Sequence, residues 1–215
     1  MPLAEPEEIK IVPAYTIAEV SRYLGMKEPT VRNWFRGPKP VLNNSGGLIS
    51  FIDVVQAHVL HTIRKGYHIP MGQVRRAAET LAKISGGLDY LAHKDFYHDD
   101  RHLFLLLDER LVSLSQGGQF VDKEIIKEGL RQLEYGGDGF TDAFFPRANG
   151  AVQTAFAINP KMNFGKLCLV RLGIGAEAIR DRFHAGESVS DIALDYGVRG
   201  DEVEEAIRWH DRLAA

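Results

Sequence analysis

The chain has 215 residues, of which 45% are hydrophobic and 26% are charged. This balance is typical of globular proteins and excludes disordered and fibrous classes; the length allows one large domain or a few small ones. The single cysteine, Cys168, excludes an intramolecular disulfide and fits a reducing cytoplasm. We expect a cytoplasmic protein outside the membrane, because no apolar run reaches the roughly 20 residues of a membrane helix and residues 1–15 lack a secretory signal pattern.

Charge is distributed unevenly along the chain. Residues 10–88 hold eleven Lys or Arg and four Asp or Glu. Residues 90–215 hold fifteen Lys or Arg and twenty-one Asp or Glu. A basic front and an acidic rear indicate contact with a polyanion at the front and with a different partner at the rear. A chance difference between segments is the alternative.

Residues 1–13, an acidic segment that ends at Pro13, are expected to be a flexible leader. The first helix then begins at a capping box, with Thr16 as N-cap and Glu19 three residues later. Gly25 ends this helix, since glycine tolerates the left-handed conformation, and a second helix can begin at Glu28 with Pro29 in its first position. This spacing predicts a helix-turn-helix.

The second helix carries side chains suited to DNA. Val31 and Trp34 would face the first helix, which leaves the other side to groups that bind phosphates, guanine or adenine. Two short apolar runs, residues 37–42 and 48–51, flank a polar loop and predict a β-wing. The candidate DNA-binding residues are Thr30, Arg32, Asn33, Arg36, Lys39, Asn43 and Asn44. The alternative is a helical hairpin with a solvated basic face.

Two more helices follow, one opened by a Ser50-x-x-Asp53 cap and one opened at Pro70. The segments T-I-A-E-V-S-R-Y-L-G, T-V-R-N-W, L-I-S-F-I-D-V-V and R-K-G-Y-H-I-P-M-G-Q-V together resemble the MerR-type winged helix-turn-helix. The resemblance covers about residues 14–84 and implies a DNA-binding domain over residues 14–86. The long dimerising helix of that family is missing here.

Residues 90–135 form the expected linker and dimerisation region. Residues 103–107 and 111–114 flank a three-residue polar turn and predict a β-hairpin, and residues 121–135 show helical spacing. Because helix-turn-helix proteins usually read two half-sites with two-fold symmetry, we expect a homodimer that uses this apolar hairpin as its interface.

Residues 140–215 begin with strands and end with three short helices. The expected helices span residues 177–184, with Ile179 and Phe183 inward, then a second from the cap Ser188 to Tyr196, and a third over residues 201–213. The phrases R-F-H-A-G-E-S-V-S-D-I-A-L-D-Y-G-V and E-V-E-E-A-I-R-W resemble the domain of unknown function 433, over about residues 155–212.

A winged helix joined to such a domain resembles VapB-type antitoxins. The resemblance implies the antitoxin of a type II toxin–antitoxin system, which neutralises a PIN-like ribonuclease toxin and represses its own operon by binding operator DNA. The last helix is acidic and suits a basic partner rather than DNA. The candidate toxin-binding residues are Arg180, Asp201, Glu202, Glu205 and Arg208.

No constellation for catalysis is found. His58 and His61 lie three residues apart on one helix, but no further ligand spacing supports a metal site, and no nucleophile is paired with a base. We therefore expect no enzyme, no cofactor and no metal. Two other functions stay open: a stand-alone MerR-like regulator with a ligand-binding C-terminal region, and a protein-interaction adaptor.

The fold class that follows is mainly α with small β elements (α+β). Its expected parts are the N-terminal winged helix-turn-helix, the central β-hairpin plus helix, and a C-terminal three-helix, homeodomain-like domain.

Overall fold

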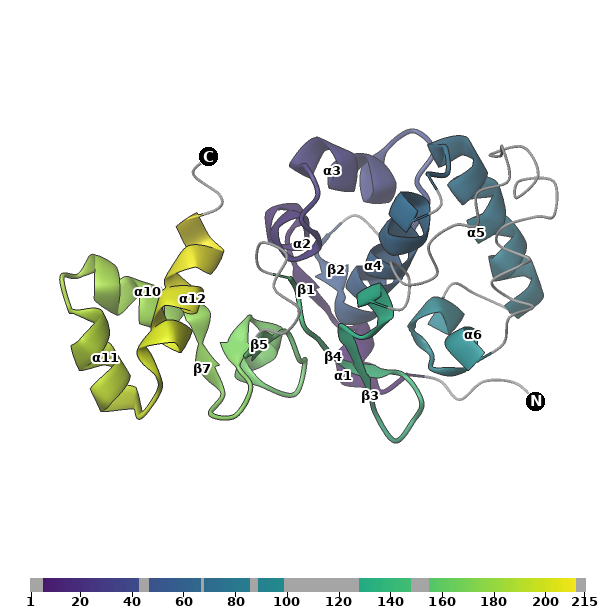
Figure 1. The fold of residues 1–215 in the computed structure, drawn as a ribbon. Coiled ribbons are helices and arrows are strands. Elements are labelled where there is room, and N and C mark those ends of the chain that lie inside the picture. The colour runs from purple at the N-terminus through teal and green to yellow at the C-terminus, as the bar shows by residue number, and fades with distance from the viewer. Residues whose placement is uncertain are drawn as a thin grey trace.

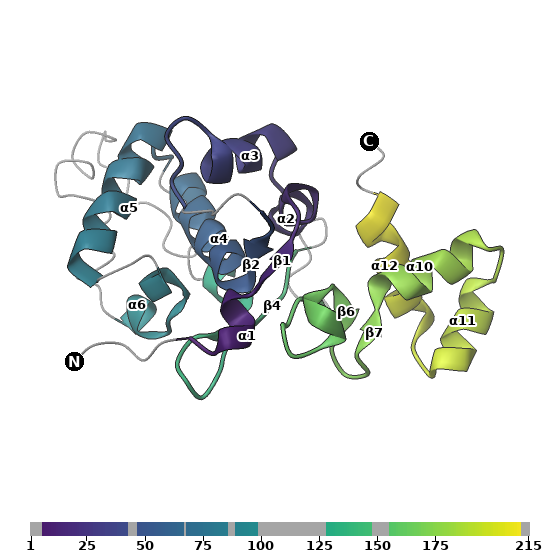
Figure 2. The ribbon, with the colours of Figure 1, turned by 180° about the vertical axis from the view of Figure 1, so that it is seen from behind.

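The computed structural model confirms a mainly helical fold with small antiparallel sheets. Two views show a larger body that holds the helices between residues 8 and 98 and a smaller lobe that holds the helices between residues 176 and 211 (Figures 1 and 2). The structure describes residues 6–42, 47–66, 68–85, 89–98, 128–147 and 155–211. None of the helices within these ranges is long and apolar enough to cross a bilayer.

The two helices of the predicted helix-turn-helix follow the sequence signals. The Thr16 hydroxyl accepts the Glu19 N–H and the Glu19 carboxylate accepts the Thr16 N–H, so α2 (Ile17–Leu24) begins at the predicted capping box. Gly25 ends it in the left-handed conformation, with φ of 62°. After two more residues α3 (Glu28–Arg36) begins, with Pro29 in its first turn. Its apolar residues Val31, Trp34 and Phe35 are buried.

The expected pairing of the wing is wrong. The strand β2 (Ile49–Ser50) pairs with β1 (Pro13–Tyr15) rather than with residues 37–42. The N–H groups of Val41 and Leu42 both donate to the carbonyl of Trp34 instead. Prolines at positions 38 and 40 lack the N–H that a strand ladder requires, which explains why this segment does not pair. Residues 43–46 lie outside the described ranges.

The longest of the described helices, α4 (Phe51–Gly66), forms the centre of the body (Figure 1). It begins at the predicted cap, where the Ser50 hydroxyl accepts the Asp53 N–H at 3.1 Å. Most of its side chains are buried beneath α1 (Glu8–Ile11), α2, α5 (Met71–Ser85) and the 3-10 helix η1 (Asp89–Ala92). The short α6 (Asp95–His98) follows η1. A helix enclosed in this way is the core of the body.

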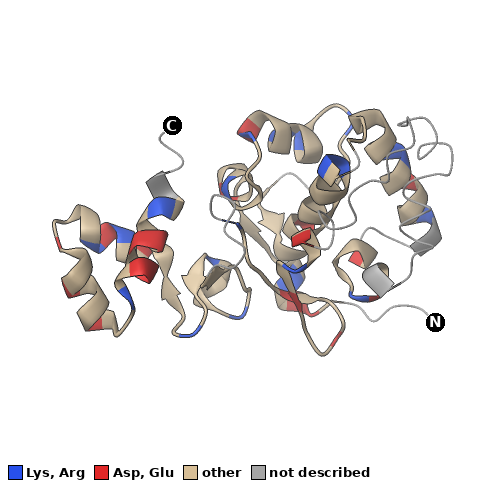
Figure 3. Cartoon of the chain, in the orientation of Figure 1, with Lys and Arg blue, Asp and Glu red and all other residues tan. Residues whose placement is uncertain are grey.

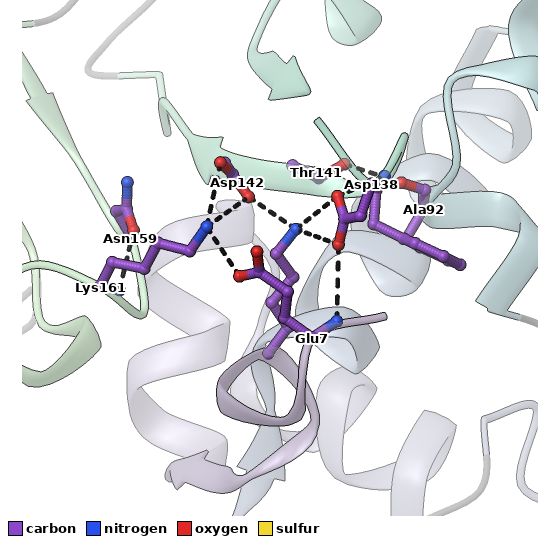
Figure 4. Close-up of polar contacts among 9 residues, drawn as sticks. Glu7, Ala92, Asp138, Thr141, Asp142, Asn159 and Lys161 are labelled. Carbon is purple, nitrogen blue, oxygen red and sulfur yellow. Dashed lines mark hydrogen bonds and ion pairs between the residues drawn. The ribbon is translucent and has the colours of Figure 1, made fainter. Parts of the chain in front are cut away.

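Residues 1–13 were expected to form a flexible leader, but α1 lies within them and β1 begins at Pro13. The α1 residue Lys10 is fully buried, and its Nζ lies 2.8 Å from a carboxylate oxygen of Asp138 and 2.6 Å from one of Asp142 (Figure 4). Both carboxylates come from a region more than 120 residues away in sequence. The flexible-leader prediction failed because local sequence gives no sign of this long-range ion pair.

The helix expected over residues 121–135 is wrong at its end. Residues 128–130 are helical, but Leu133–Tyr135 is the strand β3, which pairs with β4 (Thr141–Phe144). Between them lies a turn in which Gly139 adopts a φ of 86°. Pairing with β4 decides the conformation of residues 133–135, and helical periodicity in the sequence carries no information about that partner. The hairpin predicted over 103–114 lies outside the described residues.

The C-terminal region begins with a three-stranded sheet of order β5 (Phe156–Ala157), β6 (Cys168–Leu169) and β7 (Ile174–Gly175). The helices α10 (Ala176–His184), α11 (Val189–Tyr196) and α12 (Gly200–Asp211) follow, close to their predicted bounds. Ile179 is buried as expected. The inward placement of Phe183 is wrong: its side chain is 38% exposed, and its ring meets His184 edge-on in the last turn of α10.

Several contacts join the C-terminal sheet to the body. The buried Tyr15 hydroxyl donates to the carbonyl of Gly165, in the 3-10 turn η2 (Asn163–Gly165), at 2.8 Å. Phe144 and Ile158 exchange two backbone hydrogen bonds, and Lys166 forms an ion pair with Glu19. The sheet is therefore part of the same hydrogen-bonded framework as β1 and β4, while α10, α11 and α12 extend from it.

Candidate nucleic-acid and partner interfaces

The face of α3 that is turned away from α2 carries the polar residues singled out in the sequence. Arg32, Asn33 and Arg36 are exposed and Thr30 is half-buried, because the buried Val31, Trp34 and Phe35 occupy the other side. Arg32 forms an i,i+4 ion pair with Glu28. The Arg36 guanidinium donates to the carbonyl of Gly47 and so links α3 to the segment before β2.

Lys39 is exposed, and its carbonyl accepts a hydrogen bond from the Nε of Arg75 at 2.9 Å. This bond connects the segment after α3 to α5. Asn43 and Asn44 lie outside the described residues, so the structure does not place these two candidates.

A pocket of about 290 Å³ opens between α3, the end of α4 and the start of α5. Thr30 and Asn33 line it from α3, and Arg64 and Arg75 line it from α4 and α5. The Nε of Arg64 is buried and has no hydrogen-bond partner within the described part of the chain. Two guanidinium groups beside an amide and a hydroxyl can bind a phosphate group through charge-assisted hydrogen bonds. The pocket is lined by Pro29, Thr30, Asn33, Trp34, Arg64, Met71 and Arg75.

Sequence reasoning missed Arg64 and Arg75 as members of this site. They lie on different helices from α3, and only the packing of α4 and α5 brings them to it. The available signal was the excess of basic residues over residues 10–88. Figure 3 shows Lys and Arg on α3, at the end of α4 and on α5, with few carboxylates between them.

The five candidate toxin-binding residues differ in exposure, although all of them except Arg180 lie on α12. Asp201 and Arg208 are exposed, and each pairs with a neighbour on the lobe, Arg199 at 2.9 Å and Glu204 at 3.2 Å. Arg180, on α10, forms ion pairs with Glu177 and Asp181 of its own helix. Glu205 is half-buried, and burial raises its pKa.

Glu202 does not belong to an exposed acidic face, so that expectation is wrong for this residue. Its side chain is only 4% exposed, accepts the backbone N–H of Arg199 at 2.8 Å and pairs with Arg171 at 3.0 Å. Burial raises the pKa of this carboxyl, but these two partners outweigh burial and hold the pKa below its usual range. Glu202 therefore joins the start of α12 to the turn between β6 and β7.

His58 is a core residue of α4, and His61 on the same helix is half-buried. The Nε2 of His58 lies 2.8 Å from the carbonyl of Gly129, and its ring lies 4.5 Å from that of Phe144. Burial lowers the pKa of both histidines to about 4, so both are neutral at neutral pH. No cluster of three His, Cys, Asp or Glu suited to a metal ion exists among the described residues.

The comparisons with known proteins agree with the C-terminal resemblance. Residues 157–209 match the family model "Protein of unknown function (DUF433)". This segment runs from β5 to α12 and includes the whole small lobe except its last two described residues.

Two matches from Mycobacterium tuberculosis, one to a curated protein and one to a solved structure, extend over nearly the whole chain. One, named "Putative antitoxin VapB45", from strain H37Rv, is 24% identical over 99% of this chain and all of its own length. The other is the crystal structure of Rv2018, with a TM-score of 0.73 and 26% identity over 92% of this chain and 98% of that one. The chain is thus VapB-like in sequence along its length, and its fold is that of Rv2018.

Proposed function

We propose that this protein is the antitoxin of a type II toxin–antitoxin system, which neutralises a PIN-like ribonuclease toxin and represses its own operon as a homodimer in the cytoplasm. The observation that carries the proposal is the similarity to VapB45 over 99% of the chain. Similarity confined to the small lobe would have supported a shared module alone. Here the similarity also covers the body, which carries the basic surface of α3.

In this proposal α2 and α3 are a helix-turn-helix of MerR-like type and α3 enters the major groove. Asn33, exposed on the outer face of α3, is suited to bidentate contact with adenine. The arginines of the neighbouring pocket, Arg64 and Arg75, are suited to a backbone phosphate, which positions the helix without reading sequence.

The test is a gel shift with the full chain and the DNA upstream of its own gene. Asn33→Ala is expected to weaken operator binding by about 1–3 kcal/mol while leaving non-specific binding nearly unchanged. Arg75→Met is expected to weaken binding to every sequence and to reduce the salt dependence by about one phosphate contact.

Arg208→Ala is the matched control, because Arg208 is an exposed arginine on the distant α12. It is expected to leave DNA affinity unchanged. If Asn33→Ala and Arg75→Met also bind like the wild type with their fold intact, α3 is not the DNA reader. Operator binding combined with no affinity for any nuclease would favour the stand-alone regulator instead.

A further inference from the structure

The outer face of α11 carries an exposed leucine between carboxylates. Leu194 is 85% exposed, and Ser190, Asp191 and Asp195 around it on this short helix are also exposed. Burial of a leucine side chain away from water is favourable, and Leu194 forgoes this gain in the isolated chain. A single exposed leucine is common on protein surfaces, so Leu194 points to a partner only together with the charge around it and the place of α11 in the fold.

The local structure holds Leu194 in this position. The Ser188 hydroxyl caps α11 by accepting the Asp191 N–H at 3.1 Å, and Gly197 ends the helix with φ of 63°. Ile192, two residues before Leu194 and therefore about 200° away around the helix, is fully buried against the lobe. Leu194 cannot reach the core of the lobe without removing Ile192 from it.

The lobe around this face is strongly acidic. Residues 176–211 hold ten Asp or Glu and four Arg. Each of these arginines forms an ion pair with a carboxylate of the lobe itself: Arg180 with Asp181, Arg182 with Asp195, Arg199 with Asp201 and Arg208 with Glu204. The excess of negative charge is therefore left to attract a basic partner.

The position of α11 separates this face from the basic surface of the body. In both views α11 is the helix of the lobe farthest from α3, α4 and α5 (Figures 1 and 2). A partner seated on α11 would leave α3 open to DNA. The two surfaces can then be occupied at the same time.

From these observations we infer that the outer face of α11, defined by Ser190, Asp191, Leu194 and Asp195, is where the basic nuclease toxin docks. Leu194 inserts into an apolar pocket of that partner, and Lys or Arg side chains at the rim of the pocket face the carboxylates. The inference rests on the proposed function and moves the principal contact from α12, where Glu202 is buried, to α11. A nuclease needs basic residues to hold RNA phosphates, and this face complements them.

The experiment co-expresses the full chain with the product of the adjacent gene and measures the affinity of the purified partners. Leu194→Asp is expected to raise Kd about tenfold or more, as loss of an interface anchor does, whereas Leu194→Met retains binding. Ser190→Lys, which adds a positive charge to the face, also raises Kd. Raising the salt from about 0.1 to about 0.5 M weakens wild-type binding because it screens the charges.

Leu172→Asp is the matched control, since Leu172 is another exposed leucine, 46% exposed in the turn between β6 and β7. Wild-type affinity in both Asp variants overturns the α11 inference alone. Failure of the wild-type chain to bind the adjacent product overturns the antitoxin proposal as well. If Leu194→Asp lowers the mass of the chain alone in light scattering, α11 contacts a second copy, which also contradicts the inference.

Discussion

At the scale of the residue, the buried ammonium group of Lys10 joins the N-terminal helix of the body to a distant part of the chain. It forms ion pairs with the carboxylates of Asp138 and Asp142, which are only partly exposed (Figure 4). Partial burial raises the pKa of Asp138, but its hydrogen bonds from Lys10 and from the Phe140 N–H outweigh burial and lower the pKa overall. The carboxylate therefore contributes stability at neutral pH, which is lost as the pH falls below about 4 and through the lowered value.

Lys10→Met is expected to destabilise the fold by about 3 kcal/mol, because it leaves two carboxylates together without their buried cation. Chemical denaturation at neutral pH measures the loss. Lys161→Met is the control: Lys161 pairs with Glu7 at 2.7 Å and also contacts Asp142, but it is exposed, so its removal costs less than about 1 kcal/mol. Equal losses in the two variants would contradict the structural role given to Lys10.

His58 predicts a loss of stability in mild acid. Its folded pKa of about 4 lies below the unfolded value of about 6.5, so between these values the unfolded chain binds a proton that the folded chain does not. Stability is full above the unfolded value and falls as the pH drops from about 6.5 to about 4. His58→Gln keeps a donor for the Gly129 carbonyl but does not titrate. Its melting temperature is expected to fall less than that of the wild type between neutral pH and about pH 5.

At the scale of the element, substitution by alanine is expected to change stability in opposite directions at Gly25 and at Gly72. In neither case does an added Cβ meet an atom within 4 Å, so only backbone conformation differs. Gly25 has φ of 62° at the end of α2, and Gly25→Ala is expected to cost about 1 kcal/mol. Gly72 lies in the first turn of α5, and Gly72→Ala is expected to stabilise by about 0.4–1 kcal/mol. Thermal melts of the two variants that shift in the same direction would contradict this interpretation.

At the scale of the whole molecule, residues 1–89 are not expected to fold as an independent unit. Cutting the chain there removes the β3–β4 hairpin, whose turn holds Asp138 and whose second strand holds Asp142, the two carboxylates that pair with Lys10. It also removes η2, whose Gly165 carbonyl accepts a hydrogen bond from the Tyr15 hydroxyl. A buried cation without partners is strongly destabilising. Circular dichroism of this fragment is expected to show helix without a cooperative melt. A fragment that melts like the full chain would show that the rear of the chain does not support the front.

The sequence by itself determined where most helices begin and end. The capping box at Thr16, the cap at Ser188 and the glycines at positions 25 and 197 lie where the signals placed them, because a cap is satisfied within a few residues. The exposed groups of α3 were predictable for the same reason. Helical periodicity places Val31 and Trp34 on one side of α3, and because both are buried the polar residues of the other side are left exposed.

Tertiary structure alone decided which distant segments meet. The pairing of β1 with β2, the burial of Lys10 and of Glu202, and the gathering of Arg64 and Arg75 beside Asn33 all join residues from different elements. Each depends on a partner that local spacing does not encode, so the same lysine or glutamate is interpreted as a solvated charge in sequence and becomes a buried ion pair in the fold. The physical reason is that desolvating a charge is tolerated only where a counter-charge is brought to it, and the packing of the whole chain makes that choice.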